Sequence, residues 1–324
     1  MPLVSPSSYR EPGWPLRCRH IQTILPSYFR HDASVPYRRE VLPMPDGGDE
    51  LWLDWSRVGS DKLLIVSHGL CGHSRRHYVL SLVRAFNAAG WDCLAWNYRG
   101  TGDSPCRALR FTTNNSTDEL ALVTAHALKA GGYKQLFYSG YSMGGNLTAL
   151  YFTREAETLP SQVVGGAVFC ATTDLVAGDA ALGTLMGRVY ARHFIKSLLV
   201  KLRAGASALP KGISLAGAEK FHSFSQFDDR FTAPLCGFKD AHDYYVTASA
   251  CRHYAKLRVP LLMVQPQNDP FLAGESFPVE EAKRSKLLYL EMPRGGGHCG
   301  FITPGKAQWW PARRALEFMR QITG

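Results

Sequence analysis

The sequence lacks the patterns that define several other protein classes. No run reaches the roughly 18 consecutive apolar residues that a membrane-spanning helix needs, and no internal repeat or low-complexity tract occurs. The eight cysteines are scattered without a C-x-x-C pair, which argues against a zinc ribbon or a disulfide scaffold. The N-terminus has neither the apolar core nor the cleavage site of a signal peptide. These absences predict a soluble, cytoplasmic protein with reduced thiols.

Signatures of nucleotide, nucleic-acid and metal binding are missing too. The chain has no Walker loop, and no recognition helix or RNP motif accompanies its basic charge. His73 and His77 stand four residues apart, but the pattern supplies no third zinc ligand. We therefore expect no metal, no organic cofactor and no nucleic-acid partner.

Hydrophobic patterning predicts the architecture. Two short strand patterns cover residues 38–42 and 50–56, and buried-strand patterns then alternate with helical patterns of 10–15 residues. The strands are expected at 62–67, 91–97, 135–140 and 163–170, and the helices at 78–89, 117–130 and 146–155. Such alternation is typical of βαβ units and a mainly parallel sheet.

The alternation stops at about Leu175, and a helix-like, basic stretch continues to about Arg258. Strand patterns resume at 259–265 and 286–292, and an amphipathic helix closes the chain at 309–322. Because strands on both sides of the stretch are needed to finish the sheet, we expect one α/β domain over residues 1–324. It carries an irregular N-terminal arm (1–37) and an inserted helical cap (about 175–258).

A candidate nucleophile lies between a predicted strand and a predicted helix. Residues 140–144 read Gly-Tyr-Ser-Met-Gly, which fits the G-x-S-x-G nucleophile elbow in the context that this motif requires. A serine lifted above a sheet sits on a strained turn, where neighbouring side chains would collide. Ser142 is therefore the predicted nucleophile.

A serine hydroxyl needs a base, which a third group orients, and α/β hydrolases order them as Ser, acid, His. His298 lies in a glycine-rich loop after the last predicted strand, whereas His253 precedes its strand. For the acid, Asp269 follows the carboxyl end of strand 259–265, where ligands of parallel sheets gather. Asp174 occupies the other eligible position, but it also suits a helix N-cap. We predict His298 as the base and Asp269 as the acid.

Two backbone N–H groups are predicted to form the oxyanion hole. One belongs to Met143, which follows the nucleophile, and the other to Leu70 in the loop after strand 62–67. In the same loop, His68 is interpreted as a structural brace. Cys71 and Cys299, which neighbour these groups, are interpreted as small core residues, with a thiol-sensitive active site as the lesser alternative.

At this point the motifs resemble a known family. HGLCGHSRRHYV, NYRGTGDS, GYSMGGN, QNDPF and GGGHCGF together look like the α/β-hydrolase superfamily, and more narrowly its YheT-like branch. The likeness extends to HIQTILP, PYRRE and FDDRFTAP…GFKDAHDYY, so it covers nearly the whole chain. It implies a serine esterase with Ser142, His298 and Asp269 as its triad. Members of the branch include carboxylesterases of short-to-medium acyl chains and membrane-associated lipases or phospholipases.

The sequence thus predicts a hydrolase of small-molecule carboxylic esters, including acylglycerol- or lipid-like ones, which works through an acyl-enzyme. An acyltransferase with the same triad would pass the acyl group to an alcohol faster than to water. A non-catalytic ligand-binding member of the fold would give no product burst from activated esters. The sequence does not determine the oligomeric state.

The net charge of +10 is concentrated in one region. Residues 183–258 hold twelve basic and five acidic side chains, a net charge of +7. Within them, residues 185–203 pattern as a helix with an apolar stripe beside basic residues. Such a helix either packs on the core with a solvated basic face or meets an anionic membrane surface.

Overall fold

The computed structural model describes residues 3–29, 34–45, 47–102, 104, 106–107, 109–303 and 309–324. Asp46, between the two strand patterns at 38–42 and 50–56, and Asp103 of the NYRGTGDS motif lie outside these residues.

Across the described residues, nine strands form one sheet in the order β1-β9-β8-β7-β6-β4-β5-β3-β2. Neighbours are parallel except where β3 pairs with β5 and β2. The central strands are apolar and fully buried because helices cover both faces. The strands are β1 (Leu3–Val4), β2 (Arg38–Pro43), β3 (Glu50–Ser56), β4 (Lys62–Ser67), β5 (Asp92–Asn97), β6 (Gln135–Tyr141), β7 (Val163–Phe169), β8 (Leu261–Val264) and β9 (Leu288–Glu291).

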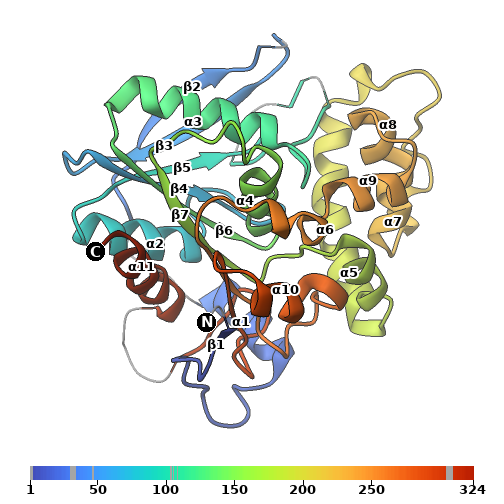
Figure 1. Ribbon diagram of the computed structural model, residues 1–324. Coiled ribbons are helices and arrows are strands. Elements are labelled where there is room, and N and C mark those ends of the chain that lie inside the picture. The colour runs from blue at the N-terminus through green and yellow to red at the C-terminus, as the bar shows by residue number, and fades with distance from the viewer. Residues whose placement is uncertain are drawn as a thin grey trace.

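Helices form a layer on each side of this sheet (Figure 1). On one face, α2 (His77–Ala88) and α11 (Trp310–Thr323) bury their apolar sides in one core cluster with β4–β8. On the other, α3 (Thr117–Gly131), α4 (Met143–Arg154) and α10 (Val279–Arg284) contribute to a second cluster. The predicted α/β-hydrolase architecture is confirmed, and α4 begins at Met143, three residues earlier than expected, directly after Ser142.

The N-terminal residues are more regular than the sequence suggested. We expected an irregular arm over residues 1–37, but β1 pairs with the edge strand β9, and residues 19–29 form α1 (Arg19–Phe29). Pro26 lies inside α1, and proline in a helix interior removes one hydrogen bond. The helical pattern was therefore easy to miss.

Between β7 and β8 the chain forms a mainly helical segment, residues 175–256, which we call the helical segment. It contains α5 (Leu175–Ala181), α6 (Leu185–Ala204), α7 (Phe224–Phe227), α8 (Ala233–Cys236) and α9 (Ala241–Ala248), and it lies to one side of the sheet (Figure 1). α6 buries Ala191, Ile195 and Leu202 in a third cluster, where Phe227 and Phe231 also pack. This packing leaves the opposite side of α6 exposed.

Among the described residues, no helix combines the length and the apolar character that crossing a bilayer requires.

Candidate active site

Ser142 occupies a sharp turn between β6 and α4. Its φ of 53° and ψ of −121° lie in a region that non-glycine residues rarely adopt. A Cβ on Gly140 would overlap Gly144 O, and a Cβ on Gly144 would overlap Ser67 O and His68 O. The two motif glycines are therefore required by close backbone approach, as the sequence predicted.

The structure brings the three predicted catalytic side chains together. His298 Nε2 lies 2.9 Å from Ser142 Oγ, and His298 Nδ1 lies 2.9 Å from Asp269 Oδ2 and 3.1 Å from Oδ1. The three residues come from separate places, namely the β6–α4 turn, the loop after β8 and the loop after β9. Together they form a continuous chain of hydrogen bonds from a hydroxyl to a carboxylate.

The surroundings of Asp269 fix this geometry. Its side chain is fully buried, that of His298 is 9% exposed, and Asp269 Oδ1 also accepts the N–H of Phe271. Burial alone would lower the pKa of His298, but the Asp269 carboxylate and neighbouring Cys299 outweigh it, so this pKa is raised well above its ordinary value. The carboxylate thus stabilises an imidazolium, which is the form His298 takes after accepting a proton.

The loop that carries His298 packs against α1, a contact that no local sequence pattern indicates. The backbone N–H of His298 donates to Thr23 Oγ1 at 2.9 Å. A Cβ on Gly300 would overlap Gln22 O. Gly300 therefore lets the loop and α1 pack closely. Thr23 is therefore a site residue that sequence reasoning missed.

An apolar cavity of about 130 Å³ opens at Ser142. Leu70 and Met143, the predicted oxyanion donors, both line it. The helical segment supplies much of the remaining wall, mainly through aromatic and leucine side chains (Leu182, Phe194, Leu198, Phe224, Phe227, Tyr244, Tyr245). Phe271 also lines it and stacks on the His298 ring, with centroids 4.1 Å apart. Ser142 thus borders a mainly apolar space.

The alternative acid and base have other places in the fold. Asp174 caps α5, since its Oδ1 accepts the N–H of Ala177, and its Oδ2 accepts the N–H of Glu275 in the loop after β8. His253 lies between two 3₁₀ turns before β8, and its N–H donates to Ala250 O. Ser142 is hydrogen-bonded to His298, and His298 to Asp269, whereas the contacts described for Asp174 and His253 lie elsewhere.

His68 lies beneath the β4–α2 loop. Its ring is buried, with Nδ1 2.8 Å from Gly69 O and Nε2 3.3 Å from Thr101 Oγ1. The Tyr98 hydroxyl donates to His68 O at 2.6 Å, and the two rings pack with centroids 3.7 Å apart. These contacts suit the bracing role that we expected.

Comparisons with known proteins agree with this fold and site. A family model described as hydrolase, serine aminopeptidase S33, matches residues 59–277. The YheT protein of Escherichia coli K12, which carries an esterase name, is 30% identical over 93% of this chain and 89% of its own. The mouse phospholipase ABHD3 is 26% identical over 87% of this chain and 70% of its own.

Solved structures show the same fold. The Pyrococcus furiosus esterase Pf2001 superposes with a TM-score of 0.58 at 18% identity, covering 90% of this chain and 92% of the other. The family match spans most of the sheet, and the relationship to YheT covers both chains almost completely. The chain belongs to the α/β-hydrolase family and, within it, to the YheT-like branch.

Proposed function

We propose that this protein is a serine hydrolase of carboxylic esters, with Ser142 as nucleophile, His298 as general base and Asp269 as the orienting acid. The observation that carries the proposal is the hydrogen-bond chain from Ser142 Oγ through His298 to Asp269, with both imidazole nitrogens at 2.9 Å from an oxygen partner. The esterase and phospholipase names of the relatives support the same chemistry.

The reaction follows from the roles of these groups. His298 Nε2 takes the proton of Ser142 as Oγ attacks the ester carbonyl, while the Asp269 carboxylate holds the imidazole and stabilises its charge. The alcohol leaves with the proton from His298, and an acyl-Ser142 ester remains. Water, activated by His298, then attacks this ester, and the acid leaves.

The oxyanion formed in each step needs donors. We assign them to the backbone N–H groups of Met143, at the N-terminus of α4, and Leu70, since both residues border the cavity at Ser142. The helical segment then acts as a cap over the site, and its aromatic wall accepts the acyl chain. This wall favours esters of short-to-medium acyl chains over charged substrates.

The first test is activity of purified protein on p-nitrophenyl esters of increasing chain length. Ser142→Ala should lower kcat/KM by on the order of 10⁴-fold and abolish fluorophosphonate labelling. His298→Gln and Asp269→Asn should lower kcat by on the order of 10³-fold or more. His253→Gln and Asp174→Asn are the matched controls and should retain activity.

The product distinguishes the alternatives. With an alcohol acceptor present, free acid should remain the main product, and acyl transfer that outruns hydrolysis would identify an acyltransferase instead. A Ser142 variant that still labels, or a folded protein that gives no burst from activated esters, would contradict the proposal.

We also propose peripheral contact with anionic membranes through α6. Its exposed face carries Arg188, Arg192 and Lys196 beside the exposed apolar side chains of Leu185 and Val189. A helix with basic and apolar side chains together suits the surface of an anionic bilayer.

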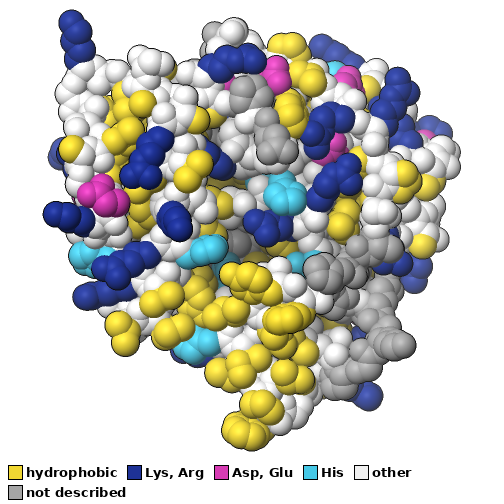
Figure 2. All heavy atoms as spheres, turned by 180° about the vertical axis from the view of Figure 1, so that it is seen from behind, with side chains coloured by type: hydrophobic (Ala, Val, Ile, Leu, Met, Phe, Trp, Pro, Cys, Tyr) yellow, Lys and Arg dark blue, Asp and Glu magenta, His cyan; other side chains and the backbone are white. Residues whose placement is uncertain are grey.

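Helix α1 extends this surface. The ring of His20 lies 2.9 Å from the hydroxyl of Tyr190 on α6, and α1 exposes Ile24, Tyr28 and Phe29. Figure 2 shows hydrophobic side chains gathered at the lower end of the back face, with Lys and Arg side chains above and beside them. Apolar insertion and attraction to anionic lipid can therefore act together.

Co-sedimentation with phosphatidylserine-containing vesicles tests this contact. Binding at low salt should fall in R188E/R192E/K196E and with added salt. K129E/R313E/R320E changes the same charge on α3 and α11 and should bind like the wild type. Absence of binding even at low salt would leave the basic residues as a solvated face.

A further inference from the structure

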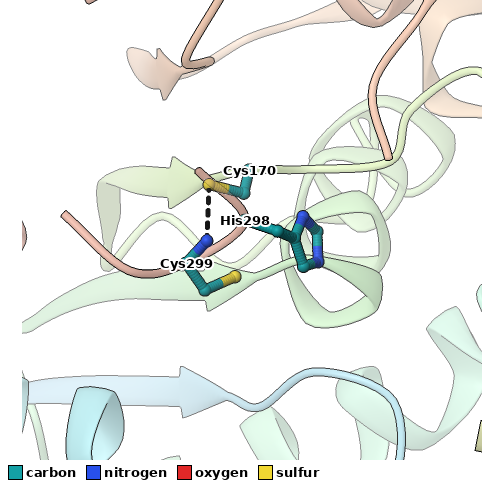
Figure 3. Close-up of side chains that lie close together, drawn as sticks. All are labelled: Cys170, His298 and Cys299. Atoms are coloured by element: carbon teal, nitrogen blue, oxygen red, sulfur yellow. Dashed lines mark hydrogen bonds between the residues drawn. The ribbon is translucent and has the colours of Figure 1, made fainter. Parts of the chain in front are cut away.

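A cluster of potential metal-ligating side chains shares His298 with the proposed triad, and its two cysteines have no catalytic role in the proposed reaction. Cys170, His298 and Cys299 each offer one ligand atom, and these atoms all lie within 4.8 Å of one another. Cys170 directly follows β7, and the other two lie in the loop after β9 (Figure 3). Among the described residues, no other group of three or more His, Cys, Asp or Glu side chains brings its ligand atoms this close together. Two sulfurs and an imidazole nitrogen are the donor types that zinc prefers.

The cluster is held by the backbone. The N–H of Cys299 donates to Cys170 Sγ at 3.1 Å, as the dashed line in Figure 3 shows. The Cys170 thiol points to Gly297 O at 3.6 Å. Cys170 is buried, whereas His298 and Cys299 are partly exposed. A cation can thus reach the group from the side of His298 and Cys299, with Cys170 as its inner ligand.

We propose that Cys170, Cys299 and His298 bind a thiophilic divalent cation of the zinc class, and that this cation inhibits the enzyme. Zn–S bonds of about 2.3 Å place two sulfurs of a tetrahedral site about 3.8 Å apart, so the donors need to close by no more than about 1 Å. Side-chain rotation supplies such a change. Water completes the fourth position, and each protonated thiol that becomes a ligand releases one proton.

Inhibition follows whichever nitrogen of His298 binds the cation. Coordination through Nε2 occupies the lone pair that accepts the Ser142 proton. Coordination through Nδ1 removes the N–H that faces Asp269 at 2.9 Å. In both cases His298 stops acting as a base, because one of its two triad contacts is lost. This consequence rests on the proposed function, whereas metal binding itself does not.

Direct binding is measured on the full-length, phosphine-reduced protein, by equilibrium dialysis with Zn²⁺ and by absorption with Co²⁺. One tight equivalent of Zn²⁺ and a thiolate-to-cobalt charge-transfer band in the near-ultraviolet are expected. Cys299→Ser and Cys170→Ser should each weaken binding at least ten-fold. Cys18→Ser and Cys251→Ser, which alter thiols outside the cluster, should leave it unchanged.

Because Cys170 is buried, Cys170→Ser could fail to fold. In that case the zinc affinity of Cys299→Ser alone tests the proposal. Ser142→Ala should keep the tight site, so binding can be scored without catalysis. Tight binding that survives both cluster variants, or no tight site in the wild type, would overturn the proposal.

Ester hydrolysis gives the second readout. Micromolar Zn²⁺ should inhibit the wild type, and a chelator should restore activity. The inhibition constant of Zn²⁺ should be at least ten-fold higher for Cys299→Ser than for the wild type, with the activity of each protein normalised to its own metal-free rate. Metal bound at the cluster without inhibition would refute the inhibitory role. Loss of the proposed function would show differently, as a wild type that binds Zn²⁺ but hydrolyses no ester.

Discussion

At the scale of single residues, the site depends on conformations and contacts that only the folded chain enforces. Ser142 keeps a positive φ of 53°, which costs on the order of 1–3 kcal/mol. Its own N–H donates to Phe169 O at 3.0 Å, and its carbonyl accepts from Asn146. These hydrogen bonds hold the turn to β7 and to α4. They prevent the strained backbone of Ser142 from relaxing, and they keep Oγ directed toward His298.

Thr23 makes a prediction at this scale, because its hydroxyl accepts the His298 N–H and donates to Arg19 O at 2.7 Å. Thr23→Val keeps the shape but leaves the N–H of His298 without its acceptor, which costs about 1–3 kcal/mol. We expect kcat to fall by roughly three- to thirty-fold with little change in KM, and Thr23→Ser to restore it. Steady-state kinetics on one ester measures both kcat and KM.

Thr323→Val is the control, since Thr323 makes the same hydroxyl bond to the carbonyl four residues earlier, on α11. If both valine variants lower kcat equally, Thr23 affects only helix stability and does not position His298.

At the scale of elements, the sequence predicted the parts whose pattern is local. The run KLLIVS is apolar throughout because β4 is covered on both faces, and G-x-S-x-G identified the turn after β6 because its glycines are needed there. α1 could not be predicted from local pattern, because Pro26 interrupts it and because it packs against a loop 275 residues later in the sequence. The same separation concealed the role of Thr23. The cluster of Cys170 with His298 and Cys299 was concealed in the same way, because Cys170 and Cys299 are 129 residues apart in the sequence.

The packing of α1 against that loop gives the element-scale prediction. In Gly300→Ala the new Cβ would overlap Gln22 O, which is backbone and cannot move aside alone. The variant should lose about 1–3 kcal/mol of stability and, with it, activity, as α1 and the His298 loop separate. Thermal unfolding by circular dichroism measures the first and ester hydrolysis the second.

Gly13→Ala is the matched control, because a Cβ there meets nothing within 4 Å. A Gly300→Ala protein with wild-type unfolding temperature and activity would show that α1 does not support the loop.

At the scale of the whole molecule, stability depends on titratable groups buried at several places. Burial raises the pKa of Asp228 and of Glu119 to about 7. Both therefore bind protons in the folded chain at a pH where the unfolded chain does not, and they favour folding as the pH falls from 7 toward 4. Burial has the opposite effect at His68, where it lowers the pKa to about 3 despite the hydrogen bond to Gly69 O.

His68 therefore makes a signed prediction. Below its ordinary value of about 6.5 the unfolded chain takes up a proton at His68, whereas the folded chain does not until about pH 3. The unfolded state binds more protons across this window, so the contribution of His68 to stability decreases as the pH is lowered. From pH 7.5 to pH 5 it should lose about 2 kcal/mol. Because Asp228 and Glu119 change in the other direction, the wild-type curve alone does not isolate this loss.

The difference between wild type and His68→Gln does isolate it. Urea unfolding at a series of pH values should show the variant losing about 2 kcal/mol less than the wild type between pH 7.5 and pH 5, whatever its stability at neutral pH. His193→Gln, at an exposed position on α6, should keep the wild-type slope. Parallel curves for wild type and His68→Gln would mean that His68 takes up its proton alike in both states, and that the bracing of the loop beside Ser142 does not depend on a neutral imidazole.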